Sequence, residues 1–239
     1  MTDPGRLPLT ITFAGSGDAF GSGGRHQACI HLRGPGFGPV LLDCGATSLS
    51  ALKGLGLDPG EVNAVLVSHL HGDHFGGLPF LILDGQFSRR TRPLAIAGPS
   101  GTSRRLAEAM ECLQVTELEP GTASTVGGVT ARAWEADHPS GAPALILRLE
   151  VAGKAIAYTG DTAWTDAIAE AAVDADLLIA EAYYRDKDVP YHLRLADLDA
   201  HRDRISARRV IITHMSDDML GHPHEARFEA ALDGLVISL

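Results

Sequence analysis

The segment His69-Leu70-His71-Gly72-Asp73-His74 is the most informative stretch of the sequence. It directly follows an apolar run, residues 64–67, that is typical of a buried strand, so its side chains lie at a strand's carboxyl end, where α/β sites usually form. His69 and His71 are two residues apart and point to one side in an extended segment, whereas Asp73 and His74 follow a glycine at which the chain can turn. Imidazole nitrogens and carboxylate oxygens are good zinc ligands, so the segment predicts a metal site.

Three further candidate ligands follow other expected strands. His138 comes just after the strand that ends at Trp134, Asp161 follows the run Tyr158-Thr159-Gly160, and His214 follows Ile211-Ile212-Thr213. Each of these residues alone is more often a capping or turn residue. Because all of them lie at the ends of apolar strands, we expect them to join the histidine-rich segment in one set.

The periodicity of apolar residues indicates alternating strands and helices. We expect strands over residues 9–14, 28–33, 40–43, 64–68, 94–97, 129–134, 144–151, 155–159, 177–180, 210–213 and 235–239. We expect helices over residues 47–55, 101–112, 162–172, 195–206 and 223–232, and a helical stretch up to about residue 84. This order favours a layered α/β architecture with two sheets and outer helices, in one domain that spans residues 1–239.

Composition restricts the class of partner. The chain of 239 residues has 20 Lys+Arg against 30 Asp+Glu, a formal net charge of −10, which disfavours a large nucleic acid as partner. No apolar run approaches the roughly 18 residues that a membrane helix needs. Cys29, Cys44 and Cys112 are odd in number and widely spaced, and no secretory signal is visible at the start. We therefore expect a cytoplasmic protein without a membrane partner.

These motifs resemble the metallo-β-lactamase superfamily of dinuclear metallohydrolases over nearly the whole chain. The resemblance rests on Phe13–Ala19, Leu41–Gly45, the His69–His74 motif, Asp137-His138, residues 159–162 and residues 213–216. It implies an α/β (α+β) fold, a four-layer αββα sandwich with the metals at one edge of the two sheets.

The resemblance also implies a ligand set. One metal would take His69, His71 and His138, the other would take Asp73, His74 and His214, and Asp161 would bridge the two. We count Asp73 among the catalytic residues as well, and expect Asp43 to hydrogen-bond the metal loop from behind. Two divalent ions, zinc by preference although manganese or iron would also bind, would activate a bridging hydroxide.

Within the superfamily the chain is most similar to ribonuclease Z and related phosphodiesterases. The run Ala180-Glu181-Ala182-Tyr183 stands where ribonuclease Z has His-Glu-Ala-Thr, and His192 follows in the helix that leads towards His214. The resemblance implies that Glu181 and His192 form the proton donor to the leaving oxygen. The alternative is a strand-end glutamate and a helix-capping histidine on the surface, which the departures at Ala180 and Tyr183 keep open.

Other departures from ribonuclease Z bear on the substrate. His138 and Asp161 are only 23 residues apart, which leaves no room for the long tRNA-binding arm, and Gly72–Phe80 contains no Lys or Arg. The basic run Ser88–Arg92 is either a solvated helix end or a phosphate contact. We therefore expect a small anionic substrate, such as a cyclic phosphodiester, as in the similar phosphonate-pathway cyclic phosphodiesterases. A lactone or thioester hydrolase and a non-catalytic metal-binding protein are the alternatives, and the resemblance allows a homodimer.

Overall fold

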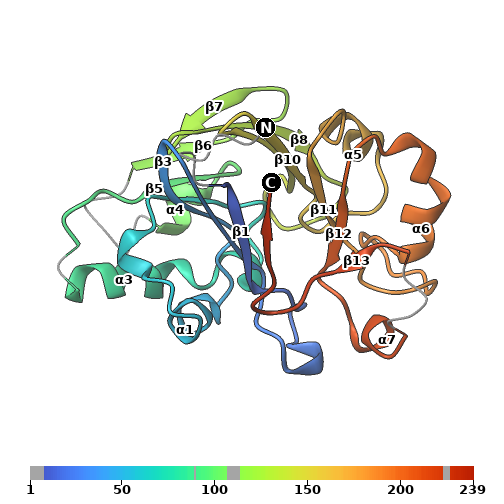
Figure 1. Cartoon of the computed structure of the whole chain (residues 1–239), viewed down its shortest axis with the longest axis horizontal. Coiled ribbons are helices and arrows are strands. Elements are labelled where there is room, and N and C mark those ends of the chain that lie inside the picture. Colours follow the sequence, from blue (N-terminus) through green and yellow to red (C-terminus); the bar gives the residue numbers. More distant parts are fainter. Residues whose placement is uncertain (1–7, 89, 107–113, 223–226) are drawn as a thin grey trace.

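Two seven-stranded sheets face each other, and helices cover their outer sides (Figure 1). The computed structural model describes residues 8–88, 90–106, 114–222 and 227–239. The expected αββα arrangement is therefore confirmed. No helix within these ranges is long and apolar enough to cross a membrane.

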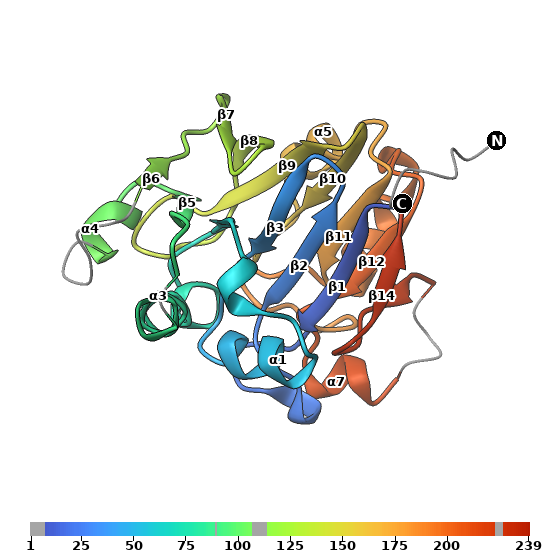
Figure 2. The ribbon, with the colours of Figure 1, turned by 60° about the vertical axis from the view of Figure 1, so that its left-hand side comes forward.

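The first sheet has the order β14-β1-β2-β3-β4-β5-β6 and is mixed. β1, β2 and β14 pair antiparallel, β2 pairs antiparallel with β3, and β3 to β6 run parallel (Figure 2). Its strands are β1 (Thr10–Gly15), β2 (Cys29–Gly34), β3 (Phe37–Leu42), β4 (Ala64–Leu66), β5 (Ala95–Gly98), β6 (Gln114–Glu117) and β14 (Val236–Ser238).

The second sheet has the order β13-β12-β11-β10-β9-β8-β7. β10 to β13 run parallel, whereas β7, β8, β9 and β10 form an antiparallel meander. Its strands are β7 (Ala123–Val126), β8 (Val129–Glu135), β9 (Leu145–Val151), β10 (Lys154–Tyr158), β11 (Leu177–Glu181), β12 (Val210–Thr213) and β13 (Glu229–Ala230).

Helices pack on the outer face of each sheet. The first sheet is covered by α1 and α3, and the second by α5 and α6 (Figure 1). The helices are α1 (Ser48–Gly54), α2 (Gly72–Phe75), α3 (Leu78–Phe87), α4 (Thr102–Leu106), α5 (Asp166–Ala171), α6 (Leu195–Ala200) and α7 (Asp217–Leu220). Short 3-10 turns are η1 (Ser22–Gly24), η2 (Pro59–Glu61) and η3 (Arg202–Arg204).

The main apolar core lies between the two sheets. It forms because side chains alternate along each strand, so that every second residue faces the opposite sheet. In β10, Ile156 and Tyr158 belong to the core between the sheets, whereas Ala155 and Ala157 belong to the layer under α5 and α6. The strand is therefore apolar on both faces, as expected for a sheet buried on both sides.

The expected helix over residues 223–232 is wrong in its described part. Residues 223–226 lie outside the described residues, and Glu229–Ala230 form β13, parallel to β12. The open edge of β12 offers backbone partners: the amide of Ala231 donates to the carbonyl of Ile212 at 2.8 Å. Tertiary pairing thus overrides a short helical pattern.

Other boundaries also differ from the expectation. The helix expected from residue 162 begins at Asp166, because the amide of Thr162 donates to Glu181 and Thr165 caps the helix. The helix expected over 195–206 ends at Ala200. Of the expected helix 101–112, α4 covers the described part, and residues 107–113 lie outside the described residues. β6, β7 and α7 were not expected.

We predict that Leu149→Ala lowers the free energy of unfolding by about 2–5 kcal/mol, because Leu149 is fully buried between the sheets. The matched control is Leu83→Ala on α3, whose side chain is 45% exposed and whose loss changes stability by about 0.5 kcal/mol or less. Urea unfolding of both variants measures the difference, and equal losses would contradict the packing described.

Candidate metal centre

The seven side chains that the sequence singled out as ligands meet at one edge of the two sheets. The carboxyl ends of β4, β8, β10 and β12 lie at this edge, since β10 and β12 share a direction and β8 runs parallel to β10 by way of two antiparallel pairings. β4 leads into the segment that carries His69, and α2 carries Asp73 and His74. The residues that follow β8, β10 and β12 supply His138, Asp161 and His214.

The ligand atoms form two overlapping groups. One group is His69, His71, His138 and Asp161, and the other is Asp73, His74, Asp161 and His214; within each, one ligand atom per residue lies within 4.8 Å of the others. Asp161 belongs to both groups: its Oδ1 lies 3.2 Å from His74 Nε2 and its Oδ2 lies 3.8 Å from His69 Nε2. This is the placement that a bridging carboxylate requires.

Several buried polar atoms at the centre lack a hydrogen-bond partner. They are Nε2 of His69, Nε2 of His74 and Oδ1 of Asp161. Burying such atoms without a partner is unfavourable, and a cation that accepts their lone pairs removes the cost. Nitrogen and oxygen donors without sulfur suit zinc and the other divalent first-row metals. The residues present therefore fit a metal site.

Asp43 sets the orientation of two of the histidines. It follows β3, is fully buried, and its Oδ2 accepts hydrogen bonds from His74 Nδ1 at 2.7 Å and from Ser68 Oγ at 2.8 Å. Ser68 Oγ in turn accepts from His69 Nδ1 at 3.0 Å. Because the Nδ1 atoms of His69 and His74 donate away from the cluster, their Nε2 atoms face it, and each can bind a metal when its imidazole is neutral.

The histidines contributed by the second sheet are oriented in the same way. His138 Nδ1 donates to the carbonyl of Tyr191 at 3.0 Å, and His214 Nδ1 donates to Glu181 Oε1 at 3.1 Å. His71 instead faces the cluster with Nδ1, which lies 3.0 Å from Nε2 of His138. His138 and His214 are thus each held through Nδ1, with Nε2 facing the cluster.

Glu181 joins the cluster to His192. This fully buried carboxylate accepts from His192 Nδ1 at 2.5 Å as well as from His214. Its other oxygen accepts from the amides of Thr162 and Leu193 at 3.0 and 3.1 Å. His192 precedes α6, so its expected place within a helix is wrong, but its ring lies 5.0 Å from that of His138. The pair that the resemblance implies is therefore formed beside the cluster.

The carboxylates control the charge of the imidazoles. Burial opposes protonation of His214, but Asp161, Asp73 and Glu181 raise its pKa to about 10. Burial likewise opposes protonation of His74, and Asp161 and Asp43 raise its pKa well above the usual range. Burial lowers the pKa of His69, which stays neutral. Without metal, protons on His74 and His214 therefore supply part of the positive charge that metal ions would bring.

Three of the five described non-glycine residues with positive φ lie at this edge. Asp43, His214 and Tyr191 adopt positive φ angles of 58°, 56° and 68° without being glycine. Such conformations are unfavourable and persist only where surrounding contacts enforce them, which is typical of functional sites. Gly160 also has a positive φ, of 55°, and a Cβ there would meet the side chain of Ser68 at 2.9 Å. The segment before Asp161 is therefore packed directly against the metal loop.

Two contributors were not predicted from the sequence. Tyr158 at the end of β10 donates from its hydroxyl to Asp43 at 2.7 Å, across 115 residues of chain. Tyr191 contributes its carbonyl, which no residue pattern reveals. Tyr158 stands at the end of a strand, three residues before the ligand candidate Asp161, and this position is the only sequence feature that could have indicated it.

One arginine of the basic run Ser88–Arg92 takes a structural role. Arg90 donates to the carbonyls of Pro59, Val62 and Arg92, so its guanidinium is held by the backbone. Arg89 lies outside the described residues. For Arg90, these contacts fit neither a solvated helix end nor a phosphate contact.

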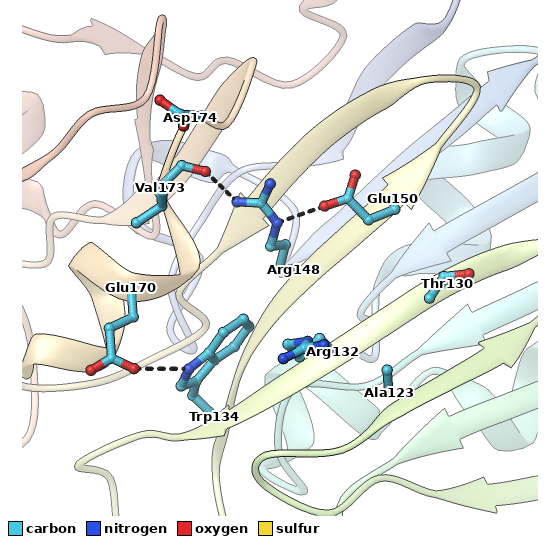
Figure 3. Close-up of a pocket in the computed structure, with 9 residues that line it drawn as sticks. All are labelled: Ala123, Thr130, Arg132, Trp134, Arg148, Glu150, Glu170, Val173 and Asp174. Carbon is cyan, nitrogen blue, oxygen red and sulfur yellow. Dashed lines mark hydrogen bonds and ion pairs between the residues drawn. The ribbon is translucent and has the colours of Figure 1, made fainter.

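A separate cavity of about 420 Å³ lies on the outer face of the second sheet (Figure 3). Its Arg148 donates to Glu150 and to the carbonyls of Ala171 and Val173, and the indole of Trp134 donates to Glu170. None of the residues that line this cavity belongs to the metal cluster. The candidate metal ligands therefore lie at the sheet edge and not in this cavity.

Comparisons with known proteins show the family. A family model described as "Beta-lactamase superfamily domain" matches residues 39–215. The chain is similar to "Ribonuclease Z" of Methanosarcina acetivorans, at 26% identity over 87% of this chain and 88% of that protein.

Solved structures share the fold. The metallo-β-lactamase fold protein YhfI from Bacillus subtilis superposes with a TM-score of 0.82 at 21% identity, over 97% of this chain and 99% of that one. A diphosphatase from the PhnP family superposes with a TM-score of 0.80 at 21% identity, over 97% and 98%. The protein belongs to the metallo-β-lactamase superfamily, and its histidine and aspartate clusters fit a metal site.

Proposed function

We propose that the protein is a hydrolase of small phosphodiesters that uses two divalent metal ions, zinc by preference. His69, His71 and His138 would hold one ion, Asp73, His74 and His214 the other, and Asp161 both. When bound, such ions lower the pKa of a water between them and stabilise negative charge on a phosphoryl group.

The observation that carries the proposal is the Glu181–His192 pair. Burial opposes protonation of His192, but its hydrogen bond to Glu181 raises its pKa, which favours the protonated imidazole. Its Nδ1 is held by Glu181, which leaves the proton on Nε2 to be given to a departing alkoxide. Hydrolysis of an alkyl phosphodiester needs such a proton, because an alkoxide is a poor leaving group. His192 is half-buried and lies beside the cluster, so a bound ester can reach it.

Charge supports a small substrate. The net charge of −10 gives little attraction for a long nucleic acid, whose affinity depends on many phosphate contacts. β9 and β10 are joined by the short turn Ala152-Gly153, where no inserted arm is present. A small phosphodiester needs only the metal centre and a few neighbouring groups.

Two alternatives remain testable. A thioester hydrolase would use the same ligands but gain little from a proton donor, because a thiolate leaves without a proton. A lactone hydrolase releases an alkoxide and would use the donor as a phosphodiesterase does, so only its substrate distinguishes it. A non-catalytic metal-binding protein would take up both ions and turn over nothing. The three functions are distinguished by measuring turnover of a set of phosphodiesters and of a set of lactones and thioesters. Each hydrolase turns over its own set, and the non-catalytic protein turns over neither.

We predict that His192→Ala lowers kcat for adenosine 2′,3′-cyclic phosphate about 10²–10⁴-fold, the usual contribution of a general acid. The loss is smaller for bis(p-nitrophenyl) phosphate, because p-nitrophenolate leaves without a proton. Glu181→Gln shows the same contrast between substrates. Steady-state kinetics of both substrates with the zinc-loaded proteins measure it, and equal losses for both would exclude His192 as the proton donor.

We predict that zinc binding to the metal-free protein at pH 7 releases about two protons, because His74 and His214 have raised pKa values and must be neutral to bind metal. Zinc affinity therefore rises with pH. Titration calorimetry in two buffers of different ionisation enthalpy gives the number, and no release would show that the imidazoles are already neutral.

We predict that Asp43→Asn lowers zinc affinity about 10–100-fold without removing a ligand, since the amide cannot accept from His74, Ser68 and Tyr158 together. The control is Asp84→Asn on α3, whose carboxylate pairs with Lys53 away from the centre. Competition with a zinc chelator compares them. The role assigned to Asp43 is contradicted if both variants bind zinc as the parent does.

A further inference from the structure

A second cavity, of about 340 Å³, opens beside the metal loop. Its size is in the range of sites for small molecules or for part of one. It is lined by Leu70, Ser100, Gly101, Arg104, Arg105 and residues 141–143. We call it the arginine pocket.

Strand topology places the arginine pocket next to the metal cluster. β4 and β5 pair in parallel, with Leu66 opposite Ala97, so the segments that leave their carboxyl ends emerge at one edge. The first segment carries the ligands His69 and His71 with Leu70 between them, and the second leads into α4.

The third wall comes from the opposite sheet. Residues 141–143 begin three positions after the ligand His138, and the amide of Leu145 just beyond them donates to the carbonyl of Ser68 at 2.9 Å. Two of the walls, Leu70 and residues 141–143, thus continue ligand-bearing segments, and the wall with the arginines follows the neighbouring strand β5.

The lining of the pocket carries positive charge. Arg104 and Arg105 are exposed, no acidic residue is among those that line the pocket, and within the described residues neither guanidinium has a hydrogen bond or an ion pair. The neighbouring carboxylate of Glu117 accepts from Ser103 Oγ and from the Gly101 amide, and Arg104 is near enough to help lower its pKa. In a chain with a net charge of −10, two exposed arginines in a cavity without an acidic lining residue favour an anionic ligand.

The cavity on the outer face of the second sheet is different. There Arg148 is bound to Glu150, and Glu170 and Asp174 also line the hollow (Figure 3). Positive charge is balanced within that cavity, so it has no comparable preference for an anion.

We propose that Arg104 and Arg105 bind a second anionic group of the substrate, a phosphate or a carboxylate, while the scissile ester lies at the metal centre. A guanidinium matches both groups through paired N–H donors. The inference rests on the proposed phosphodiesterase function and narrows its substrate class to small esters that carry an additional negative charge.

The test compares three cyclic esters that differ at one position. They are adenosine 2′,3′-cyclic phosphate with a 5′-hydroxyl, with a 5′-phosphate and with a 5′-carboxylate. We expect the zinc-loaded protein to favour one or both anionic esters in kcat/KM, mainly through KM, by about 10- to 100-fold. The better of the two identifies the group. The double variant Arg104→Gln/Arg105→Gln loses this preference but keeps its rate on the 5′-hydroxyl ester.

The matched control is Arg132→Gln in the outer-face cavity, which is also exposed and keeps the preference. Binding is measured separately, by calorimetry of the zinc-loaded protein with adenosine 3′,5′-bisphosphate and with adenosine 3′-monophosphate. We expect the bisphosphate to bind more tightly to the parent and equally to the double variant.

The two readouts separate the proposals. If all three esters are hydrolysed with equal kcat/KM by parent and double variant, the arginine pocket has no role in recognition and the phosphodiesterase proposal stands. If no ester is hydrolysed but the bisphosphate preference is present and depends on the arginines, the phosphodiesterase proposal fails and the anion site stands. If neither turnover nor a binding preference is found, both are overturned.

Discussion

The buried carboxylate of Asp43 is the constraint on which the metal centre depends. A carboxylate without solvent must be satisfied by hydrogen-bond donors, and here they come from Ser68, His74 and Tyr158. Ser68 and His74 belong to the metal loop, whereas Tyr158 ends a strand of the opposite sheet. One buried charge therefore fixes the ring orientation of two ligands and joins the two sheets directly beneath the cluster.

Glu181 has the corresponding role in the second sheet. It holds His214, which belongs to the cluster, and His192, which stands outside it, so that a single carboxylate couples the position of a ligand to that of a proton donor. Both carboxylates stand at strand ends: Asp43 follows β3 and Glu181 ends β11, at the same edge as the ligands. The arginine pocket is a third element of this edge, built on the segments that continue from β4 and β5.

The sequence was most informative where side chains that can bind a metal directly follow an apolar strand. The segment His69–His74 follows an apolar strand, and His138, Asp161 and His214 follow others, so the common rule of polar residues at strand ends predicted that they meet. Alternation along β10 predicted a strand, but it could not predict that Tyr158 reaches Asp43, because their contact depends on how the two sheets pack. Tyr191 contributes a backbone carbonyl held at positive φ, which has no side-chain signature. The helix expected near the end of the chain was wrong because the edge of β12 offers pairing that a local pattern does not reveal.

The central claim is that one edge of the fold holds two metal ions with Asp161 between them. A crystal structure with anomalous scattering measured at the zinc edge tests it most directly. We expect two peaks, each about 2.0–2.2 Å from its ligand atoms. One would have the nitrogens of His69, His71 and His138, the other the ligand atoms of Asp73, His74 and His214, and each would have an oxygen of Asp161. A single peak, or two peaks that Asp161 does not connect, would contradict it.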